Sequence, residues 1–139
     1  MSELEHAAEA RRWLEYAQED LASAAAMVEG VIGVPRQACW LAQQAAEKAM
    51  KSALVFLRAE FPRTHDLDVL RAILPNDWRA SMEHADLAEL SEWSVEARYP
   101  GDWPEATASD AGRAVALARE VVQSVVQSLG NHGVIAGGG

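Results

Sequence analysis

Cysteine is almost absent from this chain, which has one, Cys39, among 139 residues. A single thiol excludes an internal disulfide framework and is typical of proteins that fold in a reducing compartment. Long hydrophobic runs are also missing, and no stretch approaches the roughly 20 apolar residues that span a bilayer. The first residues, MSELEHAAEA, lack the basic start and apolar core of a signal peptide. We therefore expect a cytoplasmic protein with no membrane partner.

Positive charge is scarce as well, since 12 basic residues stand against 21 acidic ones and the net charge is −9. Neutralising a nucleic-acid backbone requires a basic surface, so general nucleic-acid binding is disfavoured and no DNA partner is expected. The basic segment is residues 35–63, with five basic and two acidic residues and a net charge of +3. A phosphate-bearing ligand is therefore to be sought in that segment first.

Motifs for cofactor, metal and nucleophile chemistry are missing too. The loop GVIGVP lacks the lysine and the serine or threonine of a P-loop, and it follows a helical pattern rather than a strand. The histidines show no metal-ligand spacing with one another or with Cys39; they are His6, His65, His84 and His132. We therefore expect neither a cofactor nor a metal.

What the sequence does contain is helical periodicity over most of its length. Apolar residues three and four positions apart predict long helices over residues 4–29, 35 to about 60, 76 to about 97, and from near 104 to 129. Pro35 fits a first helical position, and Thr64 is expected to cap a short helix that follows it. Asp102 and Glu105 have the spacing of a capping box for the last helix.

These elements predict an all-α fold, an antiparallel up-and-down bundle of four long helices plus one short helix. The sequence has no alternating strand pattern, no repeat and no internal linker. We expect one domain over residues 1–129 and a disordered, glycine-rich tail over residues 130–139.

Three motifs follow one another along the chain: QQAAEKAMK at residues 43–51, THDL at 64–67 and ARYP at 97–100. In this order and spacing they resemble the HEPN domain, a family named from higher eukaryotes and prokaryotes nucleotide-binding, over about residues 10–129. The resemblance implies a five-helix bundle that dimerises. It also implies the stand-alone prokaryotic type, which occurs beside a small nucleotidyltransferase as a two-protein module.

Some members of this family are metal-independent ribonucleases that carry an arginine followed, after four to six residues, by a histidine. Arg98 aligns with that arginine, but the permitted histidine positions hold Trp103, Pro104 and Glu105. The bare spacing occurs elsewhere at about the rate expected by chance, for instance from Arg58 to His65. A conventional HEPN ribonuclease is therefore disfavoured.

Arg98 and Tyr99 are the first candidates for a nucleotide-binding site, because a guanidinium can grip phosphate and a phenol ring can stack on a base. The alternative is structural, with Arg98 near a helix C-terminus and Tyr99 closing the end of the bundle. His65 either is tied to the backbone at a helix start or contacts the ligand. Lys51 either forms an ordinary helical ion pair with Glu47 or gives the ligand a positive charge.

Trp103 and Gln44 are candidates for partner binding. Trp103 stands next to a proline and either covers the end of the bundle or packs on a partner. Gln44 lies among alanines and either hydrogen-bonds across a dimer seam or marks the edge of the core. Trp13, Trp40 and Trp93 fit helix faces, where the core or a dimer seam is expected.

The leading hypothesis is a dimeric HEPN-type module that binds a nucleotide, or presents itself to a small nucleotidyltransferase, in a toxin–antitoxin-like pair. The competing hypothesis is a divergent metal-independent ribonuclease in which Arg98 acts with His65. A third is a purely structural dimeric interaction domain. The net negative charge favours the first and third over the second.

Overall fold

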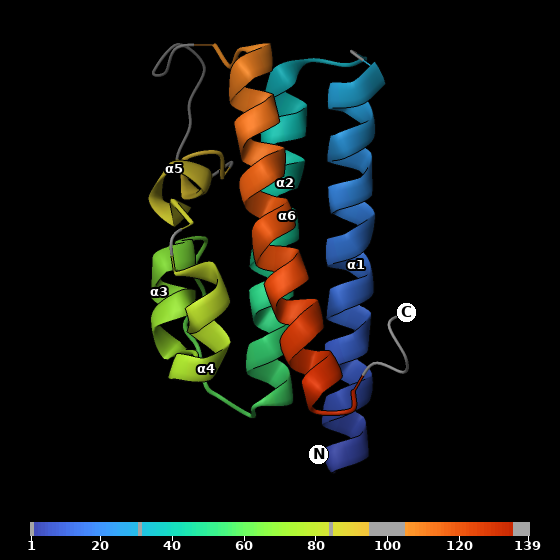
Figure 1. Ribbon diagram of the computed structural model, residues 1–139, viewed down its shortest axis with the longest axis vertical. Coiled ribbons are helices and arrows are strands. Elements are labelled where there is room, and N and C mark those ends of the chain that lie inside the picture. Colours follow the sequence, from blue (N-terminus) through green and yellow to red (C-terminus); the bar gives the residue numbers. More distant parts are fainter. Residues whose placement is uncertain (1, 31, 84, 95–104, 135–139) are drawn as a thin grey trace.

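Three long helices form the body of the molecule and lie side by side along its length (Figure 1). The computed structural model describes residues 2–30, 32–83, 85–94 and 105–134. The long helices are α1 (Glu3–Gly30), α2 (Pro35–Phe56) and α6 (Ala108–Asn131). Every element in the described ranges is helical, which confirms the predicted all-α bundle.

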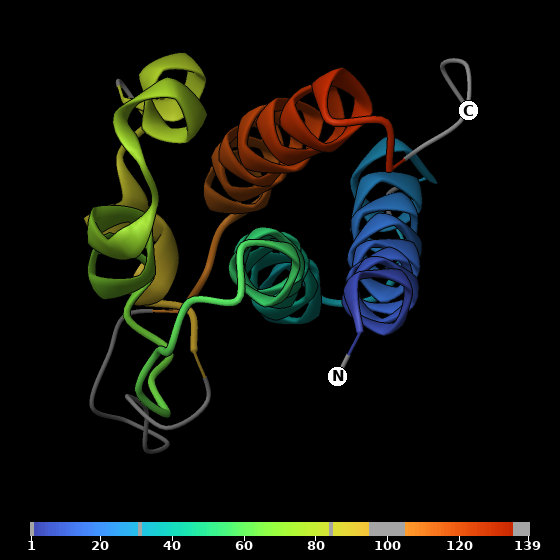
Figure 2. The same cartoon turned by 90° about the horizontal axis from the view of Figure 1, so that it is seen from below.

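The short helical elements cover the side of the bundle that faces away from α1 (Figure 2). They are α3 (Leu67–Ile73), α4 (Asn76–Arg79), the 3-10 helix η1 (Ala80–Met82) and α5 (Leu87–Ser91). Viewed along the long axis, α2 lies between α1 and these short helices (Figure 2). It contacts α1, α6, α3 and α5, so α2 is the central helix of the fold.

Alanine makes this central position possible. Six alanines of α2 are at most 2% exposed: Ala38, Ala42, Ala45, Ala46, Ala49 and Ala53. Because small side chains shorten the distance between packed helices, α1 and α6 can both approach the α2 backbone closely. The hydroxyl of Ser52 donates to the backbone carbonyl of Ala10 over 2.6 Å, which marks the close contact between α1 and α2.

The end of α2 comes earlier than the apolar pattern predicts, at Phe56 rather than near Glu60. Arg58 adopts a left-handed backbone with φ 58°. The backbone N–H of Ala59 then donates to the carbonyl of Leu54, and that of Arg58 to the carbonyl of Val55. This is a Schellman arrangement, which satisfies the last carbonyls and turns the chain away from the helix axis.

Two helices begin a few residues later than the sequence predicts. Asp66, not Thr64, caps α3, and its carboxylate accepts the backbone N–H of Asp68. The last helix begins at Ala108, where Thr107 and Asp110 form a capping box, rather than near Pro104. Asp102 of the predicted box lies outside the described residues, and the box that caps α6 is formed by Thr107 and Asp110.

The helix predicted over residues 76 to about 97 is broken into α4, η1 and α5. The predicted inward side chains Trp78, Met82 and Ala85 are nevertheless all buried. The backbone carbonyls at the break are hydrogen-bonded to a residue of α3. Arg71 donates to the carbonyls of Met82 and Ala85 over 3.1 Å each. A continuous helix would use those carbonyls itself, so Arg71 stabilises the bend.

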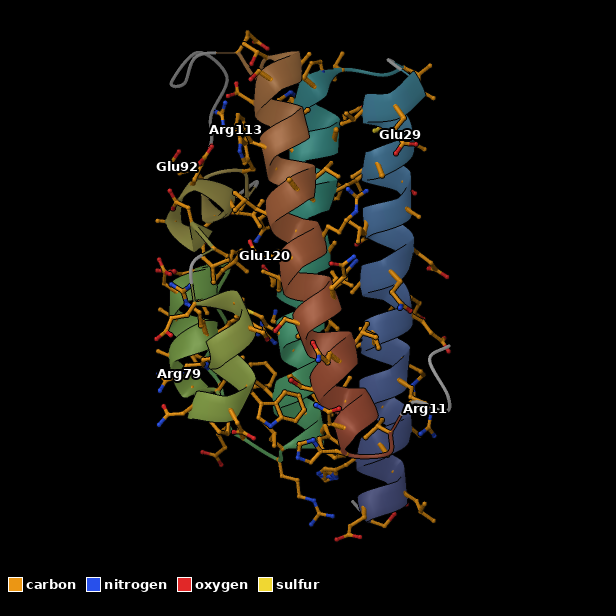
Figure 3. All side chains as sticks on the ribbon, in the orientation of Figure 1. Arg11, Glu29, Arg79, Glu92, Arg113 and Glu120 are labelled. Carbon is orange, nitrogen blue, oxygen red and sulfur yellow. The ribbon has the colours of Figure 1, made fainter. Side chains whose placement is uncertain are left out.

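An ion pair connects α6 to α5. Arg113 reaches from α6 toward α5 (Figure 3), where its Nε lies 2.9 Å from a carboxylate oxygen of Glu89.

The domain boundary predicted after residue 129 stays a prediction, and residues 135–139 of the predicted tail lie outside the described residues. None of the described helices is both long and apolar enough to cross a bilayer.

The packing of α2 gives a direct test. We expect Ala46→Leu to lower the free energy of unfolding by about 1–3 kcal/mol, because the added carbons must displace neighbouring helices. Ala26→Leu on the exposed side of α1 serves as the control and should change it by less than about 0.5 kcal/mol. Urea unfolding followed by circular dichroism measures both, and equal effects would contradict the tight packing of α2.

Candidate functional site

A cluster of polar side chains lies where α2 passes the loop before α3. Its centre is the carboxylate of Glu47, whose side chain is only 6% exposed. Nδ1 of His65 lies 2.7 Å from one oxygen of Glu47, and Nζ of Lys51 lies 2.9 Å from the other. Gln43, Glu47, Lys51 and His65 are called the carboxylate cluster below.

Gln43 completes the hydrogen bonding at the centre of the carboxylate cluster. This side chain is fully buried, and its Nε2 donates to Glu47 over 3.0 Å and to the backbone carbonyl of His65 over 3.3 Å. Its Oε1 accepts Nε2 of Gln44 over 2.8 Å. The loop carrying His65 is therefore fastened to α2 through both its side chain and its backbone.

The surroundings of Glu47 keep it ionised. Burial by itself raises the pKa of this carboxyl group. Hydrogen bonds from His65, Lys51 and Gln43, together with the charge of Lys51, outweigh burial, so the pKa lies below its ordinary value of 4.5. A buried carboxylate with three donors is stable, whereas one without them would be costly.

The ionised carboxylate determines the protonation of the histidine ring. Glu47 can only accept hydrogen bonds, so Nδ1 of His65 must carry a proton. In the neutral ring, Nε2 is then the basic nitrogen, as in other carboxylate–histidine pairs. The side chain of His65 is 35% exposed. The pair therefore provides an oriented imidazole at the protein surface.

Lys51 is oriented in a similar way, between Glu47 and an aromatic ring of α1. Its Nζ lies 6.0 Å from the ring centroid of Trp13, within the range of a cation–π contact. The next lysine toward the N-terminus, Lys48, is instead paired across the α1–α2 interface with Asp20 at 2.6 Å. The two lysines of α2 thus have different roles, one in the carboxylate cluster and one joining helices.

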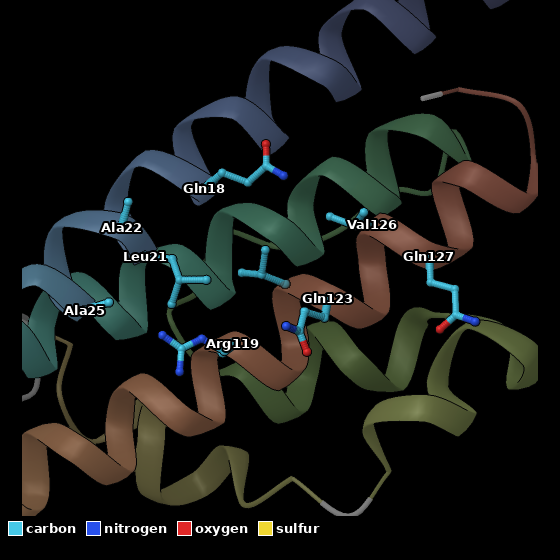
Figure 4. A pocket seen from close by; sticks show the side chains of 9 residues that line it. Gln18, Leu21, Ala22, Ala25, Arg119, Gln123, Val126 and Gln127 are labelled. Carbon is cyan, nitrogen blue, oxygen red and sulfur yellow. The ribbon is translucent and has the colours of Figure 1, made fainter. Parts of the chain in front are cut away.

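A concavity of about 430 Å³ lies between α1 and α6 (Figure 4). Arg119 is the one titratable residue among those that line it, and its guanidinium extends toward Leu21 of α1 (Figure 4). No residue of the carboxylate cluster lines this groove. Nowhere in the described ranges are three His, Cys, Asp or Glu side chains grouped to hold a metal ion.

The family model of the HEPN domain matches residues 10–129, the range that holds α2, the carboxylate cluster and nearly all of α6. The chain belongs to the HEPN domain family. This HEPN domain is a helical module of nucleotide-binding or ribonuclease-like type, and such domains commonly dimerise.

Two solved structures are similar to this HEPN domain. TT1696 from Thermus thermophilus is 29% identical over 86% of this chain and 98% of its own, with a TM-score of 0.68. ST0689, an archaeal HEPN homologue, is 28% identical over 86% of this chain and 97% of its own, with a TM-score of 0.67. A search among curated proteins finds no match.

The structure brings together two of the residues predicted for the nucleotide-binding site of this HEPN domain. His65 and Lys51 meet at the carboxylate of Glu47. Arg98 and Tyr99, the other two, lie outside the described residues, and so does the partner-binding candidate Trp103. Of the partner-binding pair, Gln44 is half-buried beside the carboxylate cluster, hydrogen-bonded to Gln43.

The sequence reasoning missed the residues that organise the site. The spacing along α2 predicts only an ordinary helical ion pair between Glu47 and Lys51, and it assigns no role to Gln43. The pair does have the expected i, i+4 spacing, but it is buried and shared with a histidine 18 positions away. A polar pair of glutamines and a glutamate amid alanines was the available signal, since buried polar residues require partners.

Replacing the central carboxylate tests its role in the fold. We expect Glu47→Gln to lower the free energy of unfolding by about 1–3 kcal/mol at neutral pH, because the amide has no charge and keeps one acceptor oxygen, so its NH2 group faces either His65 or Lys51. Because folding lowers the pKa of Glu47 below 4.5, ionised Glu47 stabilises the fold above that pH, and this contribution disappears as the pH falls below it. The wild type should therefore lose more stability in acid than the variant.

Urea unfolding at neutral and acidic pH measures the difference. Glu60→Gln is the matched control, since Glu60 is exposed and should change stability by less than about 0.5 kcal/mol. An identical acid dependence in the wild type and Glu47→Gln would contradict the assignment.

Proposed function

We propose that this HEPN domain binds a nucleotide and acts with a small nucleotidyltransferase in a toxin–antitoxin-like pair. The first part of this proposal, nucleotide binding, is called the ligand half, and it rests on the carboxylate cluster. There one buried carboxylate holds an imidazole and an ammonium at 2.7 and 2.9 Å. Side chains held in this way are pre-organised, so little conformational entropy is lost when a ligand binds to them.

The electrostatics of the site favour a phosphate group. The carboxylate cluster lies within and next to residues 35–63, the segment whose net charge is +3 in a chain of −9. Lys51 contributes a positive point charge and His65 a ring nitrogen, and both side chains are common partners of phosphate oxygens.

Arg98 and Tyr99 belong to the proposal on sequence grounds. Arg98 aligns with the arginine of the family motif, and Tyr99 follows it directly. In the proposed site the guanidinium grips phosphate and the phenol ring contacts the base. If these two residues instead have the structural role of closing the end of the bundle, Arg98→Ala will alter the free energy of unfolding more than it alters ligand binding.

The partner half of the proposal rests on the family resemblance. A homodimer and a small nucleotidyltransferase are the proposed protein partners, with Trp103 and Gln44 as contact residues. A gene for a small nucleotidyltransferase next to this one, whose product co-purifies with the chain, would support this half. A neighbourhood without such a gene, and no co-purification of the pair, would remove it.

Calorimetric titration with ATP, GTP and a short RNA tests the ligand half. We expect at least one of them to bind at millimolar concentration or below, and Lys51→Met to weaken it at least about tenfold, which is 1.4 kcal/mol. Lys48→Met is the matched control, because it removes the same charge from the same helix at a residue paired with Asp20. General attraction would weaken both variants equally.

Absence of binding for all three compounds at millimolar concentration would contradict the ligand half. The chain would then be a protein-interaction module, with the carboxylate cluster as a structural device. Equal losses in Lys51→Met and Lys48→Met would leave a nonspecific anion site and contradict the role of the cluster.

A divergent metal-independent ribonuclease is the second candidate, and the Glu47–His65 pair favours it. A carboxylate on Nδ1 leaves Nε2 of the neutral ring suited to accept the proton of a ribose 2′-hydroxyl. Arg98 would then stabilise the charge that develops on the phosphate. Such a reaction needs the imidazole and the guanidinium at one phosphate.

RNA cleavage assays separate this candidate from binding alone. If the chain cleaves RNA by this route, we expect His65→Ala and Arg98→Ala each to reduce the rate by about 100-fold or more. Lys48→Met should have little effect. Cleavage that persists undiminished in both alanine variants would assign the activity to another site or to a contaminant.

A further inference from the structure

One face of α2 continues from the carboxylate cluster toward the start of the helix. Residues seven and eleven positions apart complete nearly whole turns of an α-helix and therefore share one face. Trp40 precedes Glu47 by seven residues and Lys51 by eleven, and Gln44 lies between them on the same face. Trp40 is thus aligned with the two charged members of α2 in the cluster.

Trp40 differs from a core tryptophan in its surroundings. It is 38% exposed, whereas Trp78 is 2% exposed and stacks on His132 with ring centroids 5.1 Å apart. The sequence pattern predicts Trp40 in the core or in a dimer seam, and within the described residues the core alternative is wrong. The indole keeps part of its surface open to solvent, two turns before Glu47 on α2.

Between Trp40 and the carboxylate cluster, α2 carries Gln44, which is hydrogen-bonded to the cluster. Gln44 is one turn beyond Trp40, and its amide donates to Gln43 over 2.8 Å. Gln43 in turn donates to Glu47 and to the backbone of His65. Arg36, one turn before Trp40, is exposed. Along this face, α2 therefore carries a cation, an indole, an amide and the largely buried Glu47 and Lys51 in succession.

The spacing along this face is that of a nucleotide with several phosphates. The rise of the helix places Trp40 about 10 Å from the level of Glu47 and about 16 Å from that of Lys51. An extended nucleoside di- or triphosphate spans a comparable length from its base to its last phosphate. Inorganic phosphate and sugar phosphates are too short to contact both ends.

We propose that Trp40 is the base-stacking residue of the nucleotide site, so that the ligand is a purine nucleoside di- or triphosphate lying along α2. The phosphates lie at Lys51 and His65, and the base lies on the indole of Trp40. The inference rests on the proposed function and adds the class of ligand and a specificity residue. Purines are preferred, because a larger ring covers more of the indole.

Titrations with ATP, UTP and inorganic tripolyphosphate test the proposal. Tripolyphosphate carries the phosphates of ATP without a base, so it reports on the carboxylate cluster alone. We expect Trp40→Ala to weaken ATP binding at least tenfold, and to change tripolyphosphate binding less than twofold. Trp40→Phe, which keeps an aromatic face, should retain most of the affinity for ATP. The wild type should prefer ATP to UTP.

Tryptophan fluorescence provides a second readout that a merely structural role would not produce. ATP should quench the emission of the wild type more than that of Trp40→Phe, because the stacked indole is missing from the variant. Urea unfolding of Trp40→Ala checks that the fold is intact. If this variant is unfolded, Trp40→Phe and Trp40→Leu provide the comparison, and the aliphatic variant should bind ATP at least tenfold more weakly.

The outcomes separate the inference from the proposed function. If ATP and tripolyphosphate bind equally well and Trp40→Ala affects neither, the anion site stands and base stacking on Trp40 is overturned. Trp40 would then belong to a protein contact surface, as a dimer seam predicts. If neither compound binds, the nucleotide site itself is absent and the inference fails with it.

Discussion

The buried carboxylate of Glu47 is the interaction on which the site depends. An ionised group in the interior is costly unless each of its oxygens is hydrogen-bonded. Here one oxygen accepts His65 and Gln43 and the other accepts Lys51. These bonds tie the loop before α3 to the middle of α2, and they orient the two basic side chains as a consequence.

The position of α2 explains why such a group is buried at all. α2 contacts both long helices and two short ones, and its alanine face lets α1 and α6 approach it closely. On the side toward the loop before α3, larger polar side chains replace the alanines. Small residues therefore hold the bundle together, and the interspersed glutamines and glutamate form the carboxylate cluster next to it.

Family membership and geometry contribute different parts of the functional picture. Membership of the HEPN family gives the class of the chain, a helical module of nucleotide-binding or ribonuclease-like type. In the proposed site, His65 and Lys51 would hold an anion, and the exposed indole of Trp40, on the same face of α2, would stack on its base. Net negative charge of the whole chain makes a small ligand a better fit than a long nucleic acid.

The amino-acid pattern by itself determined the helical class, the long first, second and last helices and the basic segment. These features depend on residues close in sequence, through apolar spacing, proline at a helix start and local charge. Tertiary structure decided the break between α4 and α5, because Arg71 on another helix binds the carbonyls there. It also decided that Glu47 serves His65 as well as Lys51. Contacts between residues 18 positions apart leave no periodic signal, since folding rather than spacing brings them together.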